Sequence, residues 1–133
     1  MVSEPPTAAI LASMDADEVR FRNLLARKLV LTEDMWPILV REGLTEQTRV
    51  RLDFMYYATA KADADALASF LRAETDYEVS VTAGESGGFV IEGKTRETTI
   101  SPSILAEWVK WMVAAGYRYG RCEFDGWGTL VPS

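Results

Sequence analysis

The spacing of apolar residues after residue 48 limits the possible folds of this chain more than any other feature of its sequence. In the run from Arg49 to Tyr57, large apolar side chains at 50, 52, 54 and 56 alternate with residues suited to a surface. This period of two predicts a first strand with one buried and one exposed face. The spacing then changes to a helical period and back again, twice, before the chain ends.

The two helices predicted in this region each begin with a residue suited to capping. Asp63 is positioned to cap a helix that carries apolar residues at helical spacing and ends near Glu74. Ser101 followed by Pro102 offers a capping hydroxyl and a proline at the first helical position. The apolar stripe that follows predicts a second helix that ends near Gly116.

Three further strands complete the pattern. Alternating residues predict a hairpin of strands 77–82 and 89–93, joined by the glycine-rich segment 83–88. The alternation from 119 to 124 predicts a final strand. The order strand, helix, strand, strand, helix, strand predicts an α+β fold of the ferredoxin-like βαββαβ type, a four-stranded antiparallel sheet with two helices on one face.

The segment before this pattern is predicted to be helical. Asp15 is a candidate cap for an amphipathic helix that ends at about Val30. Asp34 is positioned to cap a second, short helix that has Pro37 in its first turn and Gly43 at its end. Whether these helices cover the open face of the sheet is not determined by the sequence.

Length and composition favour one globular domain. A chain of 133 residues with 48% hydrophobic content can bury one modest core. We therefore divide it into a flexible N-terminus, 1–14, a helical extension, 15–46, and the ferredoxin-type domain, 47–133.

The charge of the chain points away from nucleic acid. Its 20 acidic and 14 basic residues give a net charge of −6, so its surface repels phosphate on average. A basic protein segment is the expected partner, with no direct nucleic acid and no membrane. The lone Cys122 excludes an internal disulfide and, with no signal-peptide pattern at the start, favours the cytoplasm.

The residue types present exclude much catalytic chemistry. The chain has no histidine and one cysteine, which rules out Ser-His and Cys-His nucleophilic catalysis and His- or Cys-rich zinc sites. We expect Cys122 to be a buried apolar residue, and we expect no cofactor and no enzymatic activity. The carboxylates of Asp53, Glu78, Glu92 and Glu123 remain as candidates for acid–base work or cation binding, or as members of neutralising cross-strand pairs.

The run Phe124–Thr129 is the most specific motif in the chain. Gly126 and Gly128 permit backbone angles that a Cβ disfavours, so the motif predicts a turn. Trp127 between them has two possible roles, because a large amphipathic ring either locks the turn onto the core or stands as a surface anchor for a partner.

This motif resembles the Tyr-Asp-Gly-Trp-Gly-Thr ending of the RraB-type inhibitors of ribonuclease E, small acidic bacterial proteins, with Phe124 in place of the usual tyrosine. The resemblance covers about 49–131 and includes the segments 76–79 and 105–112. It implies a ferredoxin-like domain with a helical N-terminal extension. It also implies a regulator that binds the arginine-rich, non-catalytic scaffold half of ribonuclease E and lowers RNA turnover.

Our leading hypothesis is therefore a non-enzymatic regulator with an acidic protein-binding surface. The residues expected to meet the partner are Asp53, Tyr57, Glu78, Glu92, Glu123, Asp125 and Trp127. The alternative is a self-associating structural or ligand-binding module that closes its open sheet face by dimerisation, since Met55, Tyr57 and Val90 are predicted to point outward. A monomer and a homodimer both remain open.

Overall fold

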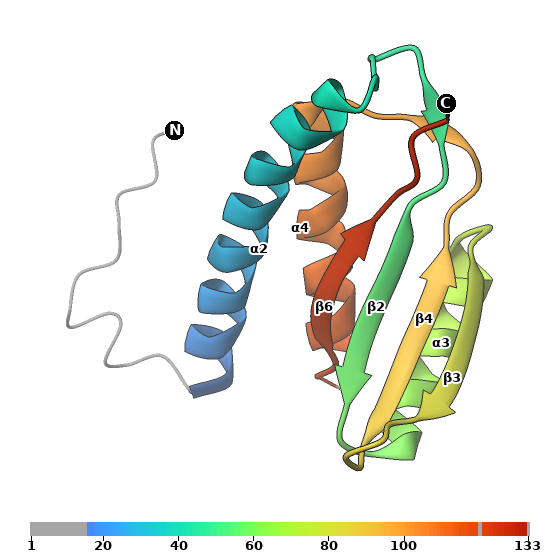
Figure 1. Cartoon of the computed structure of the whole chain (residues 1–133). Coiled ribbons are helices and arrows are strands. Elements are labelled where there is room, and N and C mark those ends of the chain that lie inside the picture. The colour runs from blue at the N-terminus through green and yellow to red at the C-terminus, as the bar shows by residue number, and fades with distance from the viewer. Residues whose placement is uncertain (1–15, 120, 133) are drawn as a thin grey trace.

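The computed structural model describes residues 16–119 and 121–132, and it contains three helices and two antiparallel sheets (Figure 1). The predicted flexible segment 1–14 and the cap Asp15 lie outside the described residues. In chain order the elements are α2 (Ala16–Arg41), β1 (Arg49–Val50), β2 (Asp53–Ala58), α3 (Lys61–Glu74), β3 (Glu78–Ala83), β4 (Phe89–Lys94), β5 (Thr98–Thr99), α4 (Pro102–Arg118) and β6 (Glu123–Gly128). No helix in this part of the chain is long and apolar enough to cross a bilayer.

The main sheet has the strand order β3-β4-β2-β6, and every neighbouring pair is antiparallel. Helices α3 and α4 pack on one face of this sheet, and the other face is open toward the viewer in Figure 1. The predicted order of strands and helices after residue 48 is therefore confirmed. Between the sheet and these helices lies an aromatic core in which Tyr56 and Phe124 are fully buried, with their ring centroids 5.2 Å apart.

The first strand is divided between two sheets. The predicted alternation is confirmed, since even-numbered residues from Val50 to Ala58 are buried. However, β1 pairs with β5 in a separate two-stranded sheet, and β2 begins only at Asp53. The join lies at Leu52, whose N–H donates to Thr95 Oγ1 (3.0 Å) and whose carbonyl accepts from the Thr95 N–H (2.9 Å). The Thr95 side chain thus replaces a ladder bond where the sheet changes.

The N-terminal region forms one helix rather than the two predicted. Pro37 lies within α2, near its end, where it removes a single backbone hydrogen bond from a helix that is otherwise continuous. The predicted stop at Gly43 is confirmed, because Gly43 has a φ of +108° and its N–H donates to the Val40 carbonyl (3.0 Å). The next N–H, of Leu44, donates to Leu39 (3.0 Å), and these two buried leucines close the helix end.

Helix α2 is part of the domain core and does not cover the open face. Leu24 is buried in the main core, and the Phe21 ring lies 4.9 Å from the Tyr117 ring of α4. Figure 1 shows α2 running beside α4 and next to the outer side of β6. The helical layer therefore has three members, and the open face stays uncovered by any described residue.

The limits of the other two helices differ partly from the prediction. Ser101 caps α4 as expected, with its Oγ accepting from the Ile104 N–H (3.2 Å). The prediction that Asp63 caps α3 is wrong, because the N-cap is Ala60, three residues earlier, and Asp63 lies in the first turn of the helix. Gly116 does not end α4. A Cβ there would meet the Tyr56 ring at 2.7 Å, so this glycine lets the strand approach the helix closely.

The prediction that the terminal motif forms a turn is also wrong, because all of the motif except Thr129 lies within β6. The predicted last strand therefore begins later than expected and runs further. Phe124 lies opposite Tyr56 and Gly126 lies opposite Met55, so Asp125 has no partner on β2. The extra residue makes a β-bulge in the strand.

This bulge decides the direction of Trp127. Phe124 and Trp127 are three positions apart, so a regular strand would point them to opposite faces of the sheet. The unpaired Asp125 shifts the alternation by one, and both rings then point toward the helices. Gly126 accommodates the shift with a φ of +155°, a backbone angle that residues with a Cβ rarely adopt.

Candidate functional site

The candidate site is the open face of the main sheet. We define it by the side chains of β2, β3, β4 and β6 that point away from the helices, all of which are exposed or half-exposed. These residues are Asp53, Met55, Tyr57, Glu78, Ser80, Thr82, Val90, Glu92, Lys94 and Glu123. Of these, Asp53, Met55, Tyr57, Glu78, Val90, Glu92 and Glu123 were predicted above to lie on this surface.

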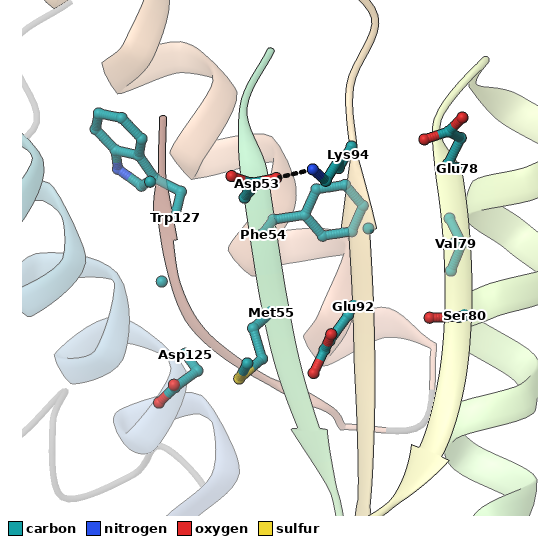
Figure 2. Close-up of a pocket in the computed structure, with 13 residues that line it drawn as sticks. Asp53, Phe54, Met55, Glu78, Val79, Ser80, Glu92, Lys94, Asp125 and Trp127 are labelled. Atoms are coloured by element: carbon teal, nitrogen blue, oxygen red, sulfur yellow. Dashed lines mark ion pairs between the residues drawn. The ribbon is translucent and has the colours of Figure 1, made fainter. Parts of the chain in front are cut away.

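Strand register arranges these side chains in three rows across the sheet, which the sequence did not reveal. The first row contains Asp53, Lys94 and Glu78; the second contains Met55, Glu92 and Ser80; the third contains Glu123, Tyr57, Val90 and Thr82. Figure 2 shows the first row at one end of the groove, with Met55 and Glu92 further along it.

The first row is neutralised by ion pairs. Lys94 Nζ lies 3.5 Å from the Asp53 carboxylate, and Arg51 Nη2 lies 2.7 Å from Glu78 Oε2. This confirms the prediction of cross-strand neutralising pairs for two of the four carboxylates. Because all four side chains are well exposed, each pair contributes at most about 1 kcal/mol to stability.

The other two rows carry carboxylates that are not neutralised. Glu92 lies between Met55 and Ser80, and Glu123 lies opposite Tyr57. Within residues 16–119 and 121–132, neither carboxylate makes an ion pair or a side-chain hydrogen bond. The open face is therefore electrically uneven, with a paired end and an acidic end.

Asp125 lies at the border of the acidic end. It is exposed in the bulge of β6, and its backbone carbonyl accepts a hydrogen bond from Lys28 Nζ of α2 (2.6 Å). This places a positive charge next to Asp125. The bond also ties α2 to the bulge.

The middle of the open face is a groove of about 780 Å³. Gly126 and Gly128 of β6 form one side of its floor, and a Cβ built on either would meet nothing within 4 Å. Met55, with 38% of its surface exposed, lies beside them. The groove therefore offers bare backbone and a thioether at its base, with carboxylates at its margins.

Tyr57 gives the acidic end an aromatic surface. The side chain is 40% exposed, and its ring lies so close to Gly88 of the hairpin turn that a Cβ there would be 2.6 Å from Tyr57 Cζ. The absence of a side chain at Gly88 therefore lets the ring lie close against the turn. A ring fixed in this way is a suitable anchor for a partner.

Trp127 borders the groove, but its ring packs on the helical side of the sheet. Its indole points away from Met55 and Glu92 and toward α2 (Figure 2), where Nε1 donates to Thr32 Oγ1 (3.0 Å). It also packs edge-on against Trp108, with centroids 6.3 Å apart. Of the two roles foreseen for this ring, the structure shows the packing role, and the ring links the sheet to both α2 and α4.

The carboxylates do not converge on one point, since Asp53 and Glu78 flank Lys94 while Glu92 and Glu123 lie in different rows. In the described part of the chain, no group of three or more His, Cys, Asp or Glu residues is arranged to hold a metal ion. Burial raises the pKa of Cys122 to about 11, with a further contribution from Asp63, so the thiol is neutral at ordinary pH.

The sequence predicts which side chains share the open face, but it does not predict the groove between them. The alternation assigned the candidate residues of the four strands to one face. The glycine floor was missed, because Gly126 points outward only after the bulge. A glycine on each side of a tryptophan was the available signal for it.

A scan against protein-family models finds no match for the chain. A search of the curated proteins finds no relative. The likeness to RraB-type proteins thus rests on the terminal motif and two shorter segments, and the function that it implies is a proposal.

Proposed function

We propose that this protein is a non-enzymatic regulator that binds a basic protein segment on the open face of its sheet. The observation that carries the proposal is the acidic end of that face. There Glu92 and Glu123 lie without a neutralising partner beside the exposed side chains of Met55 and Tyr57. Charges would attract and orient the partner, while the apolar side chains would supply most of the affinity.

The groove suits a chain segment better than a small molecule. It is open along the sheet, has a floor of backbone over Gly126 and Gly128, and lacks the enclosed apolar walls of most small-ligand sites. Lysine and arginine side chains would lay their methylenes over Met55 and place their charges near Glu92. A net charge of −6 favours the same class of partner.

The RraB resemblance supplies the partner to test first, the arginine-rich scaffold half of ribonuclease E in the cytoplasm of a bacterium. The strand order β3-β4-β2-β6 with α3 and α4 on one face supports a ferredoxin-like fold, which is part of this proposal. The protein would then act by occupying a scaffold region, with no direct contact to RNA.

The test is binding of the full chain to that scaffold half from the protein's own organism, at low and physiological salt. We expect saturable binding that weakens as salt rises, mainly through slower association. The double variant Glu92→Gln with Glu123→Gln should bind about tenfold more weakly.

A matched control removes the same charge elsewhere. Glu46 and Glu74 are exposed, make no ion pair with another described residue, and lie outside the open face, so Glu46→Gln with Glu74→Gln should bind like the wild type. Equal loss in both double variants, or an association rate independent of salt, would count against the open face as the binding surface.

The second candidate function is a self-associating module that closes this face against a copy of itself. The exposure of Met55 and Tyr57 favours it. Met55→Lys tests this second candidate. The substitution would disrupt a dimer packed sheet to sheet, so the protein's mass in solution would fall from that of a dimer to that of a monomer.

A further inference from the structure

Helix α2 carries an exposed apolar surface that the open face does not use. Val30 is 56% exposed, Leu31 is 55% exposed and Ile38 is 44% exposed. Ile38 lies eight positions after Val30 and seven after Leu31, about two helical turns on, so the three residues fall within an arc of about 100° on one side of the helix. Figure 1 shows α2 at the outside of the described structure, with α4 and β6 on its inner side.

Two opposite charges flank the centre of this surface. Arg27 lies three positions before Val30, and Asp34 lies three positions after Leu31, so both fall on the same stripe. Both are exposed, and neither makes an ion pair or a side-chain hydrogen bond in the region that the structure covers. We define the α2 stripe as Arg27, Val30, Leu31, Asp34 and Ile38.

We propose that two copies of the chain associate through the α2 stripe, antiparallel about a two-fold axis between Val30 and Leu31. The symmetry of the charges singles out this partner. An antiparallel copy places its Asp34 opposite Arg27 and its Arg27 opposite Asp34, so one contact type is formed twice. Val30 and Leu31 of the two copies meet at the axis and exclude water.

The same register also creates one kind of unfavourable contact, which occurs twice. Arg20 of one copy lies opposite Arg41 of the other at each end of the paired helices, where both are exposed. Two facing arginines repel each other. This contact limits the affinity, and it gives the proposal a variant that should strengthen association.

This surface is separate from the open face. Two copies joined through α2 leave both open faces free, so the inference does not rest on the proposed function. The dimer would instead present two acidic grooves to a partner with repeated basic segments, and linkage of two sites raises apparent affinity.

The test is the mass of the full chain in solution, measured by light scattering and by sedimentation at several concentrations. We expect a mass that rises toward twice 14.8 kDa as concentration increases. Asp34→Arg and Arg27→Asp should each weaken the dimer by about tenfold, because each turns two attractions into two repulsions. The double variant Arg27→Asp with Asp34→Arg should restore it.

Two further variants check the register. Glu33→Arg makes the same change of charge as Asp34→Arg on the neighbouring, exposed position off the stripe, and should leave the dimer intact. Arg20→Glu should strengthen the dimer, because it removes the repulsion between Arg20 and Arg41 at both ends of the paired helices. All of these positions are exposed, so the folded monomer is expected to tolerate the changes.

Other results would overturn the inference. A wild-type chain that stays at 14.8 kDa at every concentration does not self-associate through α2. A dimer that is indifferent to both single charge reversals uses another surface. Failure of the double variant to recover the dimer would exclude the antiparallel pairing of Arg27 with Asp34.

Discussion

Replacement of Gly126 by alanine tests the β-bulge that directs Trp127 into the helical layer. A Cβ at position 126 would meet nothing within 4 Å, so crowding does not oppose the change. The cost arises from the backbone, because Gly126 has a φ of +155° and an L residue with a Cβ rarely adopts this angle. Strain of this kind costs about 1–3 kcal/mol.

Gly128 is the matched control, two residues further along the same strand. A Cβ there also meets nothing within 4 Å, and its φ lies outside the positive range. Gly128→Ala should therefore be neutral or slightly stabilising, by up to about 1 kcal/mol, because alanine restricts the unfolded chain. Both substitutions add one methyl group to the floor of the same groove, so their difference isolates the backbone term.

The assay is thermal and urea unfolding of the two variants beside the wild type. For a domain of this size, 1 kcal/mol corresponds to a shift in Tm of about 3–5 °C. Gly126→Ala should lower Tm by about 3–15 °C, and Gly128→Ala should leave it nearly unchanged. Equal shifts in the two variants would refute the reasoning, because they would show that the bulge does not depend on the backbone angle at 126.

Two other predictions concern buried polar groups. Because burial raises the pKa of Cys122 from 9.0 to about 11, the folded chain holds its proton where the unfolded chain releases it, and the free energy of unfolding should fall as pH rises from about 9 to 11. A thiol reagent at pH 8 should label Cys122 only as fast as the protein opens, and labelling at the rate of a free thiol would contradict this. Thr32→Val removes the acceptor for Trp127 Nε1–H and should lower the free energy of unfolding by about 1 kcal/mol, measured from the urea midpoint. The same substitution should cost much less in a Trp127→Phe background, and an equal cost in both backgrounds would show that the hydrogen bond is not responsible.

The strands and the two helices after residue 48 were predictable because their signals are local. Alternation from Val50 to Tyr56 reports which side of a strand is buried, and the Ser101-Pro102 pair reports a helix start. Pro37 was misread because packing of α2 on α4 overrides a local preference for a break. The residues around Pro37 fit a proline in the first turn of a new helix and a proline inside a continuous helix equally well.

The candidate site was only half predictable, for a different reason. Which residues share the open face follows from parity along each strand. Which of them are neutralised depends on register between strands, and no local signal places Lys94 opposite Asp53 while leaving Glu92 opposite Met55. The bulge at Asp125 cannot be predicted from alternation along the strand, because one unpaired residue reverses the direction of every side chain that follows it.

The bonds between α2 and β6 have a consequence for the order in which the chain acquires its structure during synthesis. Thr32 meets Trp127 across 95 positions of sequence, and Lys28 meets Asp125 across 97. Helix α2 therefore leaves the ribosome well before its partners in β6 have been made. Until then its apolar residues lack the core that buries them, and an apolar segment exposed during synthesis is one that a chaperone can bind.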